Sequence, residues 1–133
     1  MKFALIQVCV DDRLNHELLR IQIRNKLNEL YIACDHVFIV NELGGNFGDN
    51  FRNTATMITN TGSQILLAAV LHHDDCRAAQ AGYRRPLDTT VGQMATFLTQ
   101  SRIDCVLLSG QIQTTNNYIT WETQQRIPPA ARP

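Results

Sequence analysis

Four short apolar runs, separated by stretches with helical periodicity, constrain the fold of this chain more than any other feature. The runs cover residues 3–9, 36–40, 65–71 and 105–108. Continuous apolar runs of this length are typical of strands that are buried on both faces. Strands that alternate with helices predict a single α/β domain with a mostly parallel central sheet.

Three segments repeat apolar residues at helical spacing and predict the helices. These segments are residues 14–30, 51–59 and 89–100. We expect Asp49 or Asn50 to cap the second helix and Asp88 to cap the third. The polar segment 77–86 is predicted to be irregular at its end.

The end of the chain predicts a closing antiparallel hairpin. Residues 111–114 and 118–121 have strand character and flank the turn sequence Thr115-Asn116-Asn117. Residues 127–133 are rich in proline and are predicted to be a disordered tail, which leaves residues 1–126 as the domain.

We expect the strand order 2-1-3-4, with the hairpin strand beside the fourth and helices on both faces. This order places the carboxyl ends of the first and third strands side by side, where the strand order reverses and ligands gather. Cys9 ends the first strand, and His73 and Cys76 follow the third. The sequence therefore predicts that these three side chains converge.

The charge of the chain excludes some classes of partner. Twelve basic and twelve acidic side chains balance to zero, which gives no support for nucleic acid or an anionic membrane and favours self-association. No apolar run reaches the roughly 18 residues that cross a bilayer. The apolar N-terminus ends at Asp11 and Asp12 without a cleavage site, so we interpret it as a strand and the protein as cytoplasmic.

The four cysteines need separate interpretations. In a cytosolic chain of this size they indicate core, metal-binding or catalytic thiols rather than disulfides. Cys34 and Cys105 lie in or beside apolar segments and are interpreted as small buried hydrophobic residues. Cys9 alone has the same interpretation, but Asp11 and Arg13 close behind it favour a site.

Two motifs carry a family resemblance. Cys9, Asp11 and Arg13 form a C-x-D-x-R pattern, and His73 and Cys76 form an H-x-x-C pattern. With a glycine-rich loop between them, the ordered pair resembles the β-class carbonic anhydrases. The resemblance extends in the same order from the first strand to the closing hairpin.

The resemblance implies that Cys9, His73 and Cys76 bind Zn²⁺. Three protein ligands with one open position are typical of catalytic zinc sites, whereas structural sites are closed. A zinc-bound hydroxide would attack carbon dioxide and give bicarbonate. The implied activity is that of a zinc lyase of the carbonic anhydrase (carbonate dehydratase) type, in a homodimer or higher homo-oligomer.

The resemblance assigns catalytic roles to Asp11 and Arg13. Arg13 would keep Asp11 ionised and oriented, so that Asp11 accepts a hydrogen bond from zinc-bound water. In some family members the aspartate instead moves onto the zinc and closes the site, and the sequence leaves both states open. Gly44 and Gly45 would border the substrate pocket.

Three positions depart from the family pattern. Arg77 replaces the usual glycine after the second cysteine, Asn41 replaces an arginine, and Leu43 replaces an alanine. The ligand set is intact, but two alternatives stay open. One is a carbon disulfide or carbonyl sulfide hydrolase with the same zinc site, and the other is a non-catalytic zinc-binding or interaction protein.

The polar neighbours of the second motif have structural interpretations. Only His73 gives the H-x-x-C spacing, so His72 is expected to pack or to point back along the strand. Asp74 and Asp75 are interpreted as a solvated turn.

Overall fold

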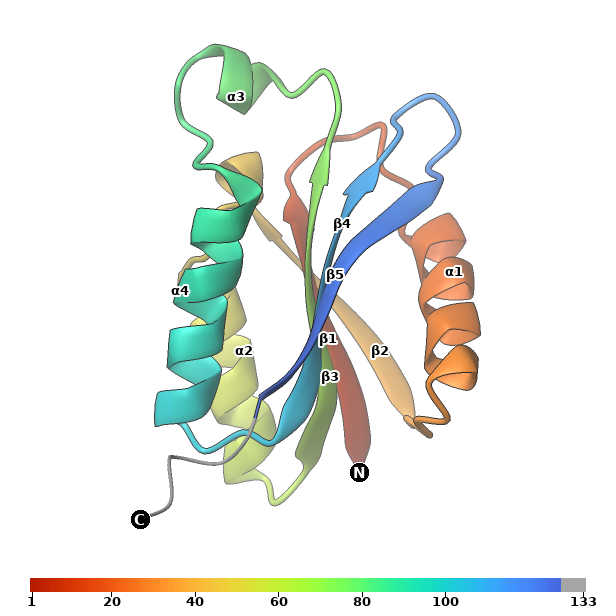
Figure 1. The fold of residues 1–133 in the computed structure, drawn as a ribbon, viewed down its shortest axis with the longest axis vertical. Helices are drawn as coiled ribbons and strands as arrows, with labels where there is room; N and C mark the ends of the chain where they lie inside the picture. Colours follow the sequence, from red (N-terminus) through yellow and green to blue (C-terminus); the bar gives the residue numbers. More distant parts are fainter. Residues whose placement is uncertain (128–133) are drawn as a thin grey trace.

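A five-stranded mixed sheet in the order β2-β1-β3-β4-β5 forms the centre of the fold (Figure 1). The computed structural model describes residues 1–127. The strands are β1 (Lys2–Cys9), β2 (His36–Glu42), β3 (Gln64–His73), β4 (Cys105–Ile112) and β5 (Ile119–Ile127). β1 pairs in parallel with β2 and β3, β3 pairs in parallel with β4, and β5 is antiparallel to β4. The predicted order and closing hairpin are confirmed.

Helices cover both faces of the sheet, as predicted. They are α1 (His16–Glu29), α2 (Asp49–Asn60), α3 (Arg77–Gln80) and α4 (Leu87–Gln100), with a 3-10 turn, η1 (Leu43–Gly45). α1 packs on one face through Leu19, Ile23 and Leu27, and α2 and α4 pack on the other (Figure 1). Because alternate residues of a strand point to opposite faces, β1 and β3 supply both cores and are apolar without alternation.

The predicted cap of α2 is wrong. Gly48 occupies the N-cap position, and neither Asp49 nor Asn50 caps the helix with its side chain. The Glu42 carboxylate instead accepts a hydrogen bond of 2.7 Å from the backbone N–H of Asn50. A residue eight positions earlier, at the end of β2, therefore satisfies a donor that was expected to be capped from within the helix.

The predicted cap of α4 is also wrong. The helix begins at Leu87, so Asp88 lies within the first turn, and Pro86 occupies the N-cap position. The backbone N–H of Thr90 donates to the carbonyl of Pro86 (3.2 Å) in the first bond of the helix, and Asp88 Oδ1 accepts from the backbone N–H of Thr89 (2.9 Å). α3 adds one helical turn at the start of the segment that was predicted to be irregular at its end.

The last strand extends further than the sequence predicts. β5 reaches Ile127, which is buried and pairs with Cys105 on β4. The first residue of the predicted tail therefore belongs to the sheet, and residues 128–133 lie outside the described residues. Within residues 1–127, no helix has the length and apolar character needed to cross a membrane.

The strand order reverses between β1 and β3. The chain leaves β1 for α1 on one face of the sheet, and leaves β3 for α3 and α4 on the other side (Figure 1). Connections that diverge to opposite faces leave a crevice at the carboxyl ends of the two strands.

Candidate metal centre

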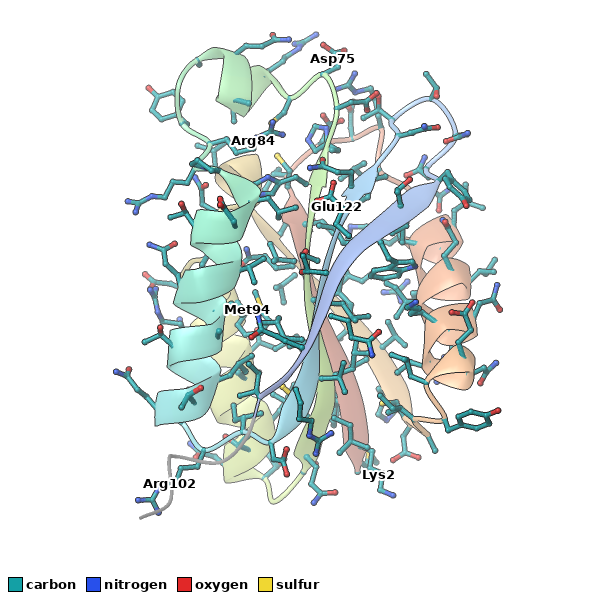
Figure 2. The ribbon with its side chains drawn as sticks, in the orientation of Figure 1. Lys2, Asp75, Arg84, Met94, Arg102 and Glu122 are labelled. Carbon is teal, nitrogen blue, oxygen red and sulfur yellow. The ribbon has the colours of Figure 1, made fainter. Side chains whose placement is uncertain are left out.

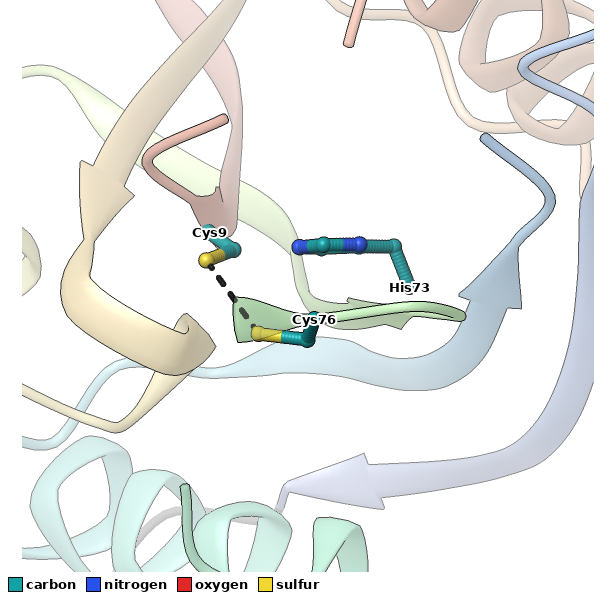
Figure 3. A group of neighbouring side chains, drawn as sticks. All are labelled: Cys9, His73 and Cys76. Atoms are coloured by element: carbon teal, nitrogen blue, oxygen red, sulfur yellow. Dashed lines mark hydrogen bonds between the residues drawn. The ribbon is translucent and has the colours of Figure 1, made fainter. Parts of the chain in front are cut away.

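Two neighbouring strands bring the predicted ligands together. Cys9 is the last residue of β1, His73 is the last residue of β3, and Cys76 lies at the N-cap position of α3 (Figure 3). All three side chains are buried, with at most 4% of each residue exposed. The crevice at the reversal point therefore contains two thiols and one imidazole.

The spacing of these ligand atoms suits a metal ion. The Sγ atoms of Cys9 and Cys76 are 3.8 Å apart, and one ligand atom from each of the three residues lies within 4.8 Å of the others. A disulfide bond is only ~2.05 Å long, and all four cysteines are free thiols. Two thiolates at ~2.3 Å from a tetrahedral metal lie about 3.8 Å apart. The group can therefore hold a metal ion without rearrangement of the two sulfurs.

His73 has one nitrogen available for this role. Its Nδ1 lies 2.7 Å from the carbonyl oxygen of Asp74, which only accepts, so Nδ1–H is the donor. The tautomer inferred from this bond leaves a lone pair on Nε2. Nε2 is buried and has no hydrogen-bond partner among the described residues. A buried nitrogen without a partner is costly unless a ligand satisfies it.

The Cys9 thiol is held in its protonated form by its surroundings. Burial, and then the neighbouring Cys76 sulfur, raises the pKa of Cys9 to about 11, while a hydrogen bond from the Gly44 backbone acts in the opposite direction. A cation between the sulfurs would favour the thiolates, so metal binding at this site would release protons.

Asp11 and Arg13 form a two-point ion pair beside the cluster. Arg13 Nε donates to Asp11 Oδ1 (3.0 Å), and Arg13 Nη2 donates to Asp11 Oδ2 (2.8 Å). The side-chain hydrogen bonds from Arg13 lower the pKa of Asp11 from 3.8 to about 2. Asp11 Oδ2 is also 3.6 Å from His73 Nε2. An ionised carboxylate is therefore held at the edge of the metal group.

The two aspartates interpreted as a solvated turn are exposed, but both have specific partners. Asp75 Oδ2 accepts a hydrogen bond from Arg13 Nη1 (2.8 Å). Asp74 Oδ1 accepts one from the backbone N–H of Thr114 (2.8 Å). Sequence reasoning missed both contacts, because Arg13 and Thr114 belong to loops that only the tertiary fold brings near.

A cavity of about 540 Å³ opens on one side of the cluster. Both metal-group cysteines line it, together with Asp11 and Arg13. The departures Leu43 and Arg77 also line this cavity. Its walls therefore combine thiol, carboxylate, guanidinium and apolar surfaces beside a group that can hold a metal.

Gly44 and Gly45 directly follow Leu43 in the chain but are not among the residues that line this cavity. Both are buried and have positive φ angles of 69° and 71°, as the glycine-rich sequence predicts. A Cβ on Gly45 would lie 3.0 Å from Cδ2 of His72, so the turn packs closely on this ring. The expected role of the two glycines in substrate binding stays a prediction.

His72 and Gln7 form a buried polar layer beneath the turn. His72 packs, which is one of the two orientations expected for it, and burial lowers its pKa to about 4. Gln7 Nε2 donates to the carbonyl oxygen of Gly45 (2.8 Å). A fully buried glutamine inside an apolar strand was the one sequence signal for this layer, and the prediction did not use it.

Comparisons with known proteins leave the family open. No protein-family model matches the chain, and no curated protein matches its sequence. The resemblance to β-class carbonic anhydrases therefore depends on the two motifs and their order.

Proposed function

We propose that Cys9, His73 and Cys76 bind one zinc ion. The spacing of 3.8 Å between two buried thiols, with the unpartnered Nε2 of His73 beside them, carries this proposal. Thiolate and imidazole ligands favour zinc over the harder cations Mg²⁺ and Ca²⁺. Three protein ligands beside a cavity are typical of a catalytic zinc site rather than a closed structural one.

The proposed reaction is the reversible hydration of carbon dioxide to bicarbonate. When bound with an open position, zinc lowers the pKa of a coordinated water towards neutrality and so supplies a nucleophile. The protein would supply charge and orientation around it. The Gly44 backbone would stabilise the Cys9 thiolate by hydrogen bonding. The Asp74 carbonyl would fix the tautomer of His73 with its proton on Nδ1, so that Nε2 can bind the metal.

Asp11 would orient the nucleophile in this reaction. The carboxylate is ionised at neutral pH, and its two-point pair with Arg13 holds it in one orientation. Oδ2 would serve as a hydrogen-bond acceptor at the edge of the ligand group, 3.6 Å from His73 Nε2. Arg77 adds a positive charge to the cavity, which suits an anionic product such as bicarbonate.

A second candidate is a non-catalytic zinc site that Asp11 closes as the fourth ligand. The distance of 3.6 Å between Asp11 Oδ2 and His73 Nε2 favours it, because a small movement away from Arg13 would bring this carboxylate onto the metal. Spectra of cobalt-substituted protein would distinguish the two candidates. If Asp11 closes the shell, Asp11→Asn changes the spectrum strongly, and if Asp11 is an outer neighbour, the change is small.

We further propose that the chain acts as a homodimer or higher homo-oligomer in the cytoplasm. Three exposed apolar side chains, Val10, Leu43 and Tyr83, line the cavity, and a second copy would cover such a surface. Thiolate ligands also suit a reducing compartment. Sedimentation at micromolar concentration tests the assembly, and a monomer would contradict it.

Metal analysis and a hydration assay on the same preparation test the proposed activity. We expect about one zinc per chain and hydration above background from about pH 7 to 9. Asp11→Asn should retain zinc and lower kcat by about 10- to 100-fold, the range for a lost outer partner of a metal site. Asp12→Asn removes the same charge from an exposed residue that also lines the cavity; it is the matched control and should lower kcat by less than Asp11→Asn does.

Two outcomes would contradict parts of this proposal. Zinc without hydration would favour the closed site, or turnover of carbon disulfide or carbonyl sulfide, which the same preparation can be assayed for. A chain without zinc would contradict the metal assignment itself.

A further inference from the structure

Arg13 is shared between two carboxylates that lie in different loops. Its Nε and Nη2 donate to Asp11, and its Nη1 donates to Asp75 Oδ2 at 2.8 Å. A second N–H of Nη2 donates to the backbone carbonyl of Asp75, also at 2.8 Å. Four of the five guanidinium N–H groups are therefore used, each once. Asp11 and Asp75 do not compete for a donor, so the two pairs can act together.

Asp75 is itself held in place on its loop. The residue has a positive φ of 49° in the turn between β3 and α3, at the end of the molecule where Figure 2 labels it. Gln80 Nε2 donates to its second oxygen, Oδ1, at 3.1 Å. In this conformation both the carboxylate and the backbone carbonyl of Asp75 accept hydrogen bonds from Arg13.

The sheet does not join the two ligand loops at this point. Within the described residues, the parallel ladder of β1 and β3 ends at the pair Gln7 and Val70. Cys9 and Cys76 both lie beyond that pair. The contacts between Arg13 and Asp75 therefore connect the loop after Cys9 to the loop that carries Cys76, past the last rung of the ladder.

The geometry points to Asp75 as a positioning residue of the metal centre. By holding Arg13, it fastens the H-x-x-C loop to the C-x-D-x-R loop and presets the separation of the Cys9 and Cys76 sulfurs. A ligand pair that is already at its bound spacing needs less ordering when the ion binds. This inference depends on the metal-binding part of the proposed function and not on the hydration reaction.

Zinc affinities of five proteins test the inference by competition with a chromophoric chelator. They are the wild type, Asp75→Asn, Arg13→Gln, the double variant with both changes, and Asp74→Asn. Asparagine is used because it tolerates a left-handed backbone. Asp74→Asn is the matched control, since it removes the same charge one residue away and leaves the backbone carbonyl that accepts from His73 unchanged. The Asp74 side chain binds the backbone of Thr114 rather than Arg13.

We expect Asp75→Asn to weaken zinc binding about two- to five-fold, the range for one exposed charge pair. In the Arg13→Gln background the same change should have less than half of that effect, because Asp75 acts through Arg13. Asp74→Asn should weaken binding less than Asp75→Asn does. Urea unfolding of each variant would show that the fold is retained.

Three results would overturn the inference. They are an equal loss from Asp75→Asn in both backgrounds, a loss from Asp74→Asn of the same size, and no loss from Asp75→Asn. Coupling between Asp75 and Arg13 in a protein that binds zinc but hydrates no carbon dioxide would support the inference and count against the proposed reaction. A wild-type chain that binds no zinc would contradict both this inference and the proposed function.

Discussion

The two ends of the parallel strands hold the same number of cysteines but differ in what those cysteines can do. At the carboxyl ends, Cys9 and Cys76 lie 3.8 Å apart with His73 beside them. At the amino ends, Cys34 precedes β2 and Cys105 begins β4. β2 and β4 are three strand spacings apart in the sheet, or about 14 Å at ~4.8 Å per spacing. Strand order decides which thiols can share an ion.

The thiols at the two ends of the strands also differ in the side chains around them. Cys105 packs within the apolar core under α2 and α4, and burial raises its pKa to about 12. Among the described residues, the group of side chains that could hold a metal ion does not include Cys105. At the carboxyl ends, Arg13 and its partner Asp11 instead line the same cavity as the thiols of Cys9 and Cys76. The interpretation of Cys105 as a core residue is confirmed, and Cys34 is half-buried beside the core.

The largest expected difference between the two ends is in zinc binding. With zinc at about 100 times its dissociation constant, the wild type should gain about 2.7 kcal/mol of unfolding free energy. Cys34→Ser at the amino end should keep this gain. Cys9→Ser at the carboxyl end should lose it, because two ligands cannot complete the shell. Urea unfolding with and without zinc measures the effect, and equal behaviour of the two variants would remove the distinction between the ends.

The second difference concerns two glycines with positive φ. A Cβ on Gly62, at the amino end, would meet no atom within 4 Å, whereas a Cβ on Gly45 would meet His72 Cδ2 at 3.0 Å. Gly62→Ala should cost about 1 to 2 kcal/mol from backbone strain alone. Gly45→Ala should cost about 1 kcal/mol or more beyond that, because the buried ring has to move. Unfolding free energies measured without metal check this prediction. An equal loss of stability from the two substitutions would mean that His72 moves aside without a measurable cost.

The smallest effect is in acid and concerns the carboxyl end alone, because Arg13 is partly exposed and exposed ion pairs contribute little to stability. The pKa of Asp11 is lowered from 3.8 to about 2 by its pair with Arg13. The pair therefore stabilises the folded state fully only at a pH above about 4. That contribution should disappear as the pH falls from about 4 to about 2. Asp11→Asn should flatten this part of the curve of unfolding free energy against pH. An unchanged slope would show that the pair stabilises the folded state little.

The sequence predicted the fold well because its strongest signals are local. Continuous apolar runs marked the strands, and helical spacing marked α1, α2 and α4. The expected cap of α2 by Asp49 or Asn50 was wrong because Glu42, at the end of β2, accepts from the backbone of Asn50. The expected cap of α4 was wrong because the helix begins one residue before Asp88. Capping rules consider the residues at the start of the helix, whereas a free N–H of the first turn can also bond an acceptor that lies outside the helix.

The candidate site was predictable only in part. Residue type and spacing selected His73 over His72, and the structure shows why two adjacent histidines differ. His72 packs under Gly45, whereas His73 lies at the strand end with Nε2 towards the cysteines. The alternation of side chains along β3 separates them. The role of Asp75 was not predictable, because nothing in the sequence indicates that it meets Arg13.

The sequence by itself determined the architecture, the three candidate ligands and their placement at or just beyond the carboxyl ends of β1 and β3. Hydrophobic patterning and chain connectivity act locally, and together they leave few ways to order parallel strands. The tertiary structure alone decided the spacing of the sulfurs, the partners of Arg13 and the packing beneath Gly45. Those features depend on distances between loops that are far apart in the chain, and only the packed sheet sets such distances.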